Sequence, residues 1–503
     1  MLFKRIIMLL LSLSLLLAAC PAMSEENRPT YVMAGFDNTN MRQWENNRFF
    51  IQMEDWTGIS FSFQQYTDAA KWKEYKSSLT AEGDMPDVLF KAALTQAECM
   101  DLLNKGVLID LKPLMPQYAP NLWAILQERP EALSAITLPD GRIAALPYIN
   151  TVPAQNYVWI NRTWLNALKM DMPATAEELV EVLTAFKTHD LNKNGRLDEI
   201  PLGFLGPFDL KFLAHGFGLI CTDYNVFEQD GKVKFMPLEE NYRLFVTWCR
   251  DLYQAGLLDK NGFSIVDSSR QVTDGNAKPT YGAIMTTAPN NLFRVSWADD
   301  YTAMPPLFYN GQQVYRDFFG PVQRGTFAVT SHCGKPEEML RWVDMLYAEK
   351  GAILATAGME NLDYFMDGDG TWRLADAAKT NGALFVAVSL MDGGASMPGI
   401  AAEDFALRYS GQTEESKKNY EAQKEMASLC RLPMPYLSLT EAQEKEIDAL
   451  QNEIGPYVDI QLGRWVLGEE EITDESFAAF EQTLNEKGLP AFLALWQEAL
   501  DAR

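Results

Sequence analysis

The sequence predicts an α/β protein of two lobes, each a sheet flanked by helices, with a helix-rich C-terminal third. Three observations support this prediction. The chain has 503 residues, more than one hydrophobic core accommodates. Its composition, 47% apolar and 22% charged residues, is that of an ordinary globular protein. Near its start, short apolar runs alternate with helical stretches, which is the pattern of a parallel sheet covered by helices.

The first lobe begins with five alternating elements. Strands are expected at 30–36, 59–63 and 87–90, and helical stretches at 44–56 and 70–81. Ligands of such sheets bind beyond the carboxyl ends of the strands. The loop after Phe36, with Asp37 and Asn38, and the segment after Phe90, which starts at Lys91, are therefore candidate binding loops.

Later elements follow the same rules. Thr175 is a predicted N-cap, with Glu177 and Glu178 in the first turn of a helix that runs to about His189. Pro336 stands near the first position of another helix, which runs to about 348. The chain from about 414 to 503 is mostly helical and acidic. Further strands are expected at 142–148, 156–160, 200–204, 281–286 and 325–330.

The first nineteen residues read as an export signal. Lys4 and Arg5 precede an apolar run at 6–17, which is too short to span a bilayer as a mature helix. The run ends in Leu-Ala-Ala-Cys, which resembles the bacterial lipobox. We therefore expect a signal peptide at 1–19, lipidation of Cys20, and a tether at 20–29. A plain secretory signal or a signal anchor is the alternative interpretation.

Charge and cysteine content narrow the function classes. The chain has 43 basic and 68 acidic residues, a formal net charge of −25, which argues against nucleic acid as a partner. The three histidines are scattered along the sequence and indicate no His-rich metal site.

Without Cys20 an odd number of cysteines remains and no CxxC occurs, so we expect buried free thiols. A Cys221–Cys249 disulfide is the alternative. The five are Cys99, Cys221, Cys249, Cys333 and Cys430.

One segment has the spacing of a calcium loop. From Asp190, oxygen-bearing side chains stand at relative positions 1, 3, 5 and 9, with Gly195 at position 6. Position 12 is Pro201, so the bidentate Glu of an EF-hand is missing, and Glu199 is the natural substitute. The alternative is a plain turn between a helix and a strand. The predicted ligands are Asp190, Asn192, Asn194, the carbonyl of Arg196, Asp198 and Glu199.

Two other patterns carry less information. The Asp-Gly-Asp-Gly run at 367–370 lacks further ligands and is better explained as a hairpin turn between 363–365 and 371–374. The HExxH, GxSxG, SxxK and Walker A signatures are absent, which gives no support to an enzyme.

Aromatic side chains in loops or at strand ends suit the binding of sugar rings. The candidate ligand residues are Asp37, Asn38, Phe90, Lys91, Tyr148, Asn150, Trp159, Trp297 and Tyr364.

Taken in order, several motifs resemble the extracellular solute-binding proteins of ABC importers (family 1), in particular large sugar-binding lipoproteins related to alginate-oligosaccharide-binding proteins. The resemblance covers nearly the whole mature chain. Its landmarks are 83–88 (GDMPDV), 140–148 (DGRIAALPY), 161–165 (NRTWL), the loop at 190–201, the helix at 337–346 followed by Gly351, and the C-terminal Gly488-Leu489 and Ala499-Leu500-Asp501. In alginate-binding relatives the matching loop holds calcium, so the resemblance adds to the prediction of structural calcium.

The resemblance implies a type II periplasmic-binding-protein-like fold, in which hinge strands let two lobes close on a ligand. The first crossing is expected near 148–153, and further ones near 298 and 332. The lobes are then 30–149 plus 299–331, and 150–298 plus 332–503. It also implies a non-enzymatic monomer, anchored on the extracellular face of the cell membrane or on the periplasmic side, which delivers its ligand to a membrane permease.

The ligand class stays open at this stage. A neutral oligosaccharide is the default expectation, and a peptide or another small solute is an alternative. An acidic oligosaccharide would need basic residues in the cleft, for which Lys91, Arg294 and Arg324 are candidates. Two other function classes compete with import: a secreted lipoprotein that hydrolyses glycans, and a surface receptor that senses a ligand.

Overall fold

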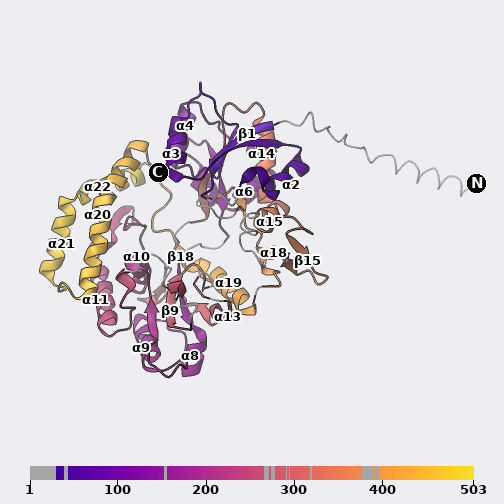
Figure 1. Cartoon of the computed structure of the whole chain (residues 1–503). Helices are drawn as coiled ribbons and strands as arrows, with labels where there is room; N and C mark the ends of the chain where they lie inside the picture. The colour runs from indigo at the N-terminus through magenta and orange to yellow at the C-terminus, as the bar shows by residue number, and fades with distance from the viewer. Residues whose placement is uncertain are drawn as a thin grey trace, which may run out of the picture.

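The computed structural model confirms the predicted fold class: two α/β lobes, with the C-terminal helices along one side of the second (Figure 1). The signal peptide, Cys20 and the tether lie outside the described residues. Within the described ranges, no helix has the length and apolar character needed to cross a membrane. Those ranges are 30–38, 43–151, 156–264, 271–273, 278–289, 292–293, 295–317, 320–375, 390, 396–411 and 413–503.

The first lobe is built on a six-stranded mixed sheet. β1 pairs in parallel with β2 and β3, and β14 runs antiparallel between β3 and β4. All three predicted N-terminal strands are present, which confirms the alternating pattern. Across the sheet the order is β17 (Gly399–Ile400), β4 (Ala145–Ile149), β14 (Val322–Val329), β3 (Val88–Phe90), β1 (Thr30–Phe36) and β2 (Ser60–Tyr66).

Alternation along these strands fills a separate core on each face of the sheet. Met33 and Phe327 point into one core, whereas their neighbours Ala34 and Ala328 point into the other. Helices α3 (Ala69–Ser78) and α4 (Gln96–Asn104) cover the second of these faces. The first is covered by α2 (Arg48–Thr57), α5 (Met115–Tyr118), α6 (Pro120–Glu128), α7 (Pro130–Ile136), α14 (Pro336–Asp344) and α15 (Glu349–Ala357).

The second lobe has a four-stranded sheet and one large core. β5 lies antiparallel between β9 and β10, and β6 pairs in parallel with β9. The order is β10 (Tyr301–Ala303), β5 (Tyr157–Asn161), β9 (Tyr281–Thr286) and β6 (Ile200–Gly203). Helices of this lobe are α8 (Arg162–Leu168), α9 (Ala176–Thr188), α10 (Gly206–Lys211), α11 (Glu240–Gln254), α13 (Val295–Ala298) and α19 (Glu414–Met426).

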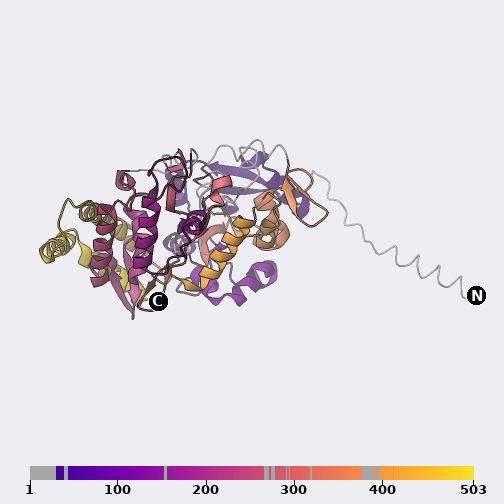
Figure 2. The same cartoon turned by 90° about the horizontal axis from the view of Figure 1, so that it is seen from below.

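Three C-terminal helices complete the second core. Seen from below, they again lie at one side of the molecule (Figure 2). They are α20 (Glu441–Leu467), α21 (Asp474–Glu486) and α22 (Leu489–Asp501), and their buried residues belong to the second core. Short ladders complete the fold: β7 (Val226–Gln229) with β8 (Lys232–Phe235), β11 (Phe308–Tyr309) with β12 (Gln312–Gln313), and β13 (Tyr315–Arg316) with β18 (Cys430–Arg431).

In the described ranges the chain passes between the lobes at three places, two of which differ from the expected boundaries. The first crossing lies between β4 and β5, which belong to different sheets. The second lies between β13 and β14, because β10 pairs with β5 in the second sheet instead of joining the first. The third lies between α18 (Glu403–Leu407) and α19, because Met339, Leu340 and Trp342 of α14 fill the first core.

Two local predictions are confirmed. The Asp-Gly-Asp-Gly run is the turn of an antiparallel hairpin of β15 (Tyr364–Met366) and β16 (Trp372–Leu374). All five cysteines after Cys20 are buried free thiols, so Cys221 and Cys249 form no disulfide.

Candidate functional site

The two predicted binding loops of the first lobe meet at one end of its sheet. Asp37 follows β1 and Lys91 follows β3, and the register places Gly35 opposite Phe90. The Lys91 ammonium lies 3.2 Å from the Asp37 carboxylate and 3.2 Å from the carbonyl oxygen of Leu390. Both side chains have an exposed fraction of 0%. The two charges thus hold the loops together, and neither faces solvent in this conformation.

Three predicted ligand aromatics are core residues instead. Phe90 and Trp159 have exposed fractions of 0% and 1%, and the Trp159 indole donates to the carbonyl of Thr286 inside the second core. Tyr364 packs against Trp372 and Phe405 in a small cluster of the first lobe. Side chains at these strand positions pack into the lobes, so they do not reach a ligand between them.

The other candidates lie nearer to the surface or to a crossing. Asn38 is exposed, whereas Tyr148 and Trp297 are half-buried. Asn150 is buried at the first crossing, where its side-chain amide donates to the carbonyl of Gly320 and accepts from Gln323. Asn150 therefore ties the first crossing segment to the second, which is a positioning role for a hinge.

An aromatic cluster beside the binding loops was missed by the sequence analysis. Tyr66 ends β2, and its ring centre lies 5.4 Å from that of Trp72 and 4.8 Å from that of Tyr75. The backbone amide of Asp37 donates to the Tyr66 carbonyl, so this cluster adjoins the first loop. Tyr66 and Tyr75 are half-buried. The signal was present, because Trp72 and Tyr75 are three residues apart on one helix and face the end of β2.

A cavity of about 550 Å³ lies between the lobes. The first lobe contributes Ala93 to Gln96 and Arg324, the second contributes Thr222 to Tyr224 and Arg316, and residues 432–437 and 439 lie against both. Two direct contacts flank it. The Thr95 hydroxyl lies 3.1 Å from the Glu444 carboxylate, and the Ser438 hydroxyl lies 2.6 Å from the Gln96 amide oxygen. Of the predicted basic residues, Arg324 lines this pocket, Lys91 does not, and Arg294 lies outside the described residues.

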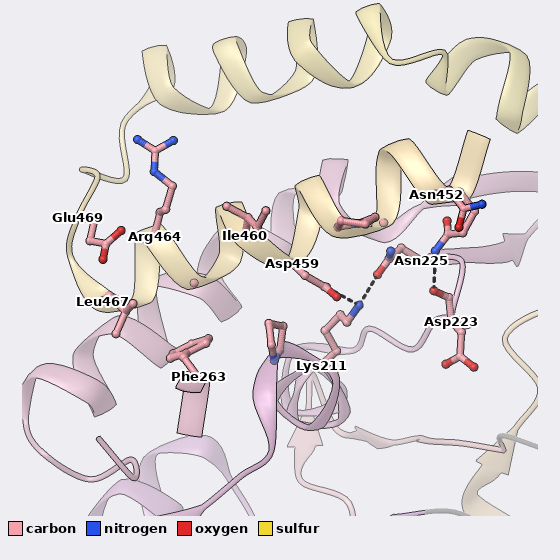
Figure 3. A pocket seen from close by; sticks show the side chains of 15 residues that line it. Lys211, Asp223, Asn225, Phe263, Asn452, Asp459, Ile460, Arg464, Leu467 and Glu469 are labelled. Carbon is pink, nitrogen blue, oxygen red and sulfur yellow. Dashed lines mark hydrogen bonds and ion pairs between the residues drawn. The ribbon is translucent and has the colours of Figure 1, made fainter. Parts of the chain in front are cut away.

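A second cavity, of about 670 Å³, runs along α20 beside α10 (Figure 3). At its base the Lys211 ammonium lies 3.0 Å from both Asp459 and Asn225. Phe263 and Ile460 add apolar surface. All of its lining residues come from the second lobe, so it is a groove of that lobe and not the space between lobes.

A buried acid lies close to the first crossing. Asp209 of α10 accepts hydrogen bonds from the backbone amide of Leu205 and the side chain of Asn156, the first described residue after the crossing. Its exposed fraction is 2%. Burial raises the pKa of Asp209 to about 7, because the carboxylate is removed from water.

This pKa predicts a pH dependence of stability. A raised pKa in the folded state means that the Asp209 contribution is complete below about pH 4 and is lost as the pH rises through about 7. Relative to an Asp209→Asn variant, the wild type is expected to lose up to about 4 kcal/mol of unfolding free energy between these limits. Urea denaturation of both proteins at pH 4.5, 6 and 8 measures the difference. A difference that does not change with pH contradicts the prediction.

The predicted calcium loop connects α9 to β6. Thr175 caps α9 as predicted, and the loop turns at Lys193 and Gly195, whose φ angles are 56° and 81°. A φ of 81° favours glycine. The Asp190 carboxylate accepts from the backbone amides of Asn194 and Gly195, at 3.0 and 2.8 Å. The acidic side chain thus folds back over its own loop.

The remaining predicted ligands also turn inward. Asp198 accepts from the amides of Asn192 and Asn194, and Lys278 lies 2.6 Å from its other oxygen. This lysine, together with the two amides, lowers the pKa of Asp198 to about 2. Glu199 has an exposed fraction of 7%; its Oε1 accepts from the amides of Leu191 and Asn192, whereas its Oε2 is buried without a hydrogen-bond partner.

These residues fit a calcium ion. Among the described residues, no group of three or more His, Cys, Asp and Glu side chains is close enough to hold a metal. Half of the predicted ligand set, however, consists of amide and carbonyl oxygens. Rotation of the Asn192 and Asn194 amides would turn oxygen toward Asp198 in place of nitrogen. The buried, unpartnered oxygen of Glu199 is the atom that most needs a cation.

Sequence comparisons identify a set of relatives. No protein-family model matches the chain. It is 32% identical over 318 residues to the fructooligosaccharide ABC transporter substrate-binding protein FusA of Streptococcus pneumoniae, over 60% of this chain and 58% of FusA. The match thus spans less than two thirds of the length of that relative.

Structural comparisons define the fold. FusA in complex with kestose matches with a TM-score of 0.70 at 24% identity, over 94% of this chain and 99% of FusA. An EF-hand mutant of FusA in complex with fructo-nystose matches equally well. A solute-binding protein of Bifidobacterium longum infantis, described as binding human milk oligosaccharides (HMO), gives 0.75 at 21% identity, over 95% and 99%. The alginate-binding protein AlgQ2, solved without calcium ion, gives 0.67 at 20%, over 95% and 99%.

The class of protein follows from these findings. The chain has the two-lobed fold of solute-binding proteins. Its homologues are substrate-binding proteins of ABC transporters, which confirms the resemblance that the sequence motifs indicated.

Proposed function

We propose that this chain is the extracellular solute-binding component of an ABC importer, which captures an oligosaccharide between its lobes and delivers it to a membrane permease. The observation that carries the proposal is the cavity between two α/β lobes linked by three crossings, because such an arrangement can close on a ligand. The similarity to FusA supports a saccharide as the ligand class.

Lipid anchoring and calcium complete the proposal. Cys20, at the end of the apolar leader, carries the lipid, and 20–29 tethers the lobes to the outer side of the membrane. Calcium would be held by Asp190, Asn192, Asn194, the Arg196 carbonyl, Asp198 and Glu199. When bound, it would clamp the connection between α9 and β6, which is a structural role.

A saccharide panel tests the proposed function. The mature protein is incubated with kestose, nystose and other neutral oligosaccharides, and with acidic ones. Differential scanning calorimetry is expected to show a raised Tm with at least one of them, because a ligand that binds only the folded state stabilises it. Chromatography is expected to show the saccharides unchanged. Shortened saccharides would contradict the proposal and favour the glycan hydrolase.

A further inference from the structure

Arg324 on the wall of the interlobe pocket lacks the partners that a guanidinium usually has. Within the described part of the chain it makes no hydrogen bond or ion pair, and its Nη1 is buried without a partner. Its contact is with an aromatic ring: the guanidinium carbon lies 4.9 Å from the centre of the Tyr436 ring. Burial lowers the pKa of Arg324, which reflects the cost of holding its charge there.

The fold directs Arg324 to this position. The next residue, Gly325, has a φ of 69°, and a β-carbon there would lie 2.0 Å from the carbonyl oxygen of Leu94. The pairing of β14 with β4 shifts register between Gln323 and Phe327. Such irregularities in a strand re-aim side chains. The pairing of β14 with β4 is thus irregular at the point where β14 places the Arg324 guanidinium on the wall of the pocket.

The acidic residues of the pocket are engaged elsewhere. Asp223 lies 2.6 Å from Arg316, and Asp317 accepts from the backbone amide of Gly320. Glu444 accepts from the Thr95 hydroxyl, and burial raises the pKa of its carboxyl group. Among the described residues, none of the three lies within ion-pair distance of Arg324, although Glu444 is near enough for the two charges to attract each other.

We propose that the interlobe pocket binds the carboxylate of an acidic saccharide on the Arg324 guanidinium. The planar fork of donors in an arginine matches the two oxygens of a carboxylate. The Tyr436 ring beside it offers apolar surface to a sugar ring. The cavity, at about 550 Å³, is of the size that takes small ligands. The inference rests on the proposed function and narrows its ligand class from oligosaccharides in general to acidic ones.

Isothermal titration with trigalacturonic acid and with kestose tests this inference. Wild type is expected to bind trigalacturonic acid. Arg324→Gln is expected to weaken that binding at least tenfold, and Arg324→Lys, which keeps the charge but not the fork, should fall between them. Unfolding curves show whether each variant folds. If folded Arg324→Gln binds trigalacturonic acid as wild type does, the inference is overturned.

Further titrations distinguish the other possible outcomes of the binding experiment. Binding of kestose alone, unchanged in Arg324→Gln, would overturn the acidic ligand and leave the proposed function intact. Binding of neither saccharide nor of any other in the panel would overturn both. Displacement of trigalacturonic acid by equimolar inorganic sulfate would show a site for free oxyanions, against the inference. Lys105→Gln, which removes an exposed positive charge at the end of α4, is the matched control: it is expected to leave the binding of trigalacturonic acid unchanged. Strong coupling between Arg324 and Glu444 in unfolding free energy would identify Glu444 as the partner and overturn the inference.

Discussion

Calcium added to the EDTA-treated protein is expected to raise its Tm by about 5 °C or more. A ligand of the folded state at 100 times its Kd contributes about 2.7 kcal/mol, and each kcal/mol shifts the Tm of a domain of roughly 150–250 residues, which is about the size of the second lobe, by roughly 2–4 °C. The physical reason is local. The Glu199 Oε2 is buried without a hydrogen-bond partner, and the carboxylates of Asp190 and Asp198 in the same loop are held by N–H donors of the loop itself. A cation would satisfy all of them at once.

Two variants and one control make the calcium prediction specific. Asp190→Ala and Glu199→Gln are expected to abolish the calcium-dependent rise in Tm. Asp369→Asn is the matched control, because Asp369 belongs to the other Asp-Gly motif, where it caps its own hairpin turn by accepting from Thr371. That variant should keep the full calcium response. Magnesium is expected to act more weakly, since it demands stricter octahedral geometry. An unchanged wild-type Tm after calcium addition refutes the loop assignment.

Local features were predictable from the sequence because neighbouring residues determine them. The proposed calcium loop takes its candidate ligands from ten consecutive residues, so their spacing alone indicates the candidate site. The N-terminal strands and helices of the first lobe also follow from local periodicity. Thr175 caps its helix as expected, since its side chain accepts from the amide of Glu178.

The lobe boundaries were harder to predict from the sequence, because they depend on which strands pair although they lie far apart in the chain. β10 is a strand of three residues with apolar Tyr301 and Ala303, a pattern that suits an edge position of either sheet. Only its ladder with Asn161 and Trp159 assigns it to the second lobe. In the same way, the apolar stripe of α14 indicates that one face of the helix is buried, but it does not indicate which of the two cores that face enters.

The placement of the candidate ligand residues also depends on packing between distant segments. Phe90 ends β3 and Trp159 lies in the middle of β5, and both short strands are buried on both faces, so the two aromatic rings enter the cores. Tyr66 escaped notice because β2 extends three residues beyond the expected end at 63. Arg324 was identified as a basic candidate, and the structure places it in the interlobe pocket, next to segments more than a hundred residues away.

Replacement of Lys91 by Met is expected to lower the free energy of unfolding by about 3–5 kcal/mol. The reason is that Lys91→Met leaves the carboxylate of Asp37 fully buried without its ammonium partner, and removal of one member of a buried ion pair costs far more than the pair contributes. Urea denaturation measures the loss. The double variant Asp37→Asn with Lys91→Met should recover much of it, because both charges are then gone.

The exposed pair Lys105–Asp101 on α4 supplies the control for this prediction. Its side chains keep 52% and 36% of their exposure, so Lys105→Met should change the unfolding free energy by no more than about 0.5 kcal/mol. A Lys91→Met variant as stable as Lys105→Met would mean that water reaches Asp37, and that the ends of β1 and β3 are open. A large loss restored by the double variant would instead show that the loops beside the interlobe space are held rigid by a buried charge pair. In that case the lobes would close on a ligand by movement at the three crossings, because the loops after β1 and β3 would keep their conformation.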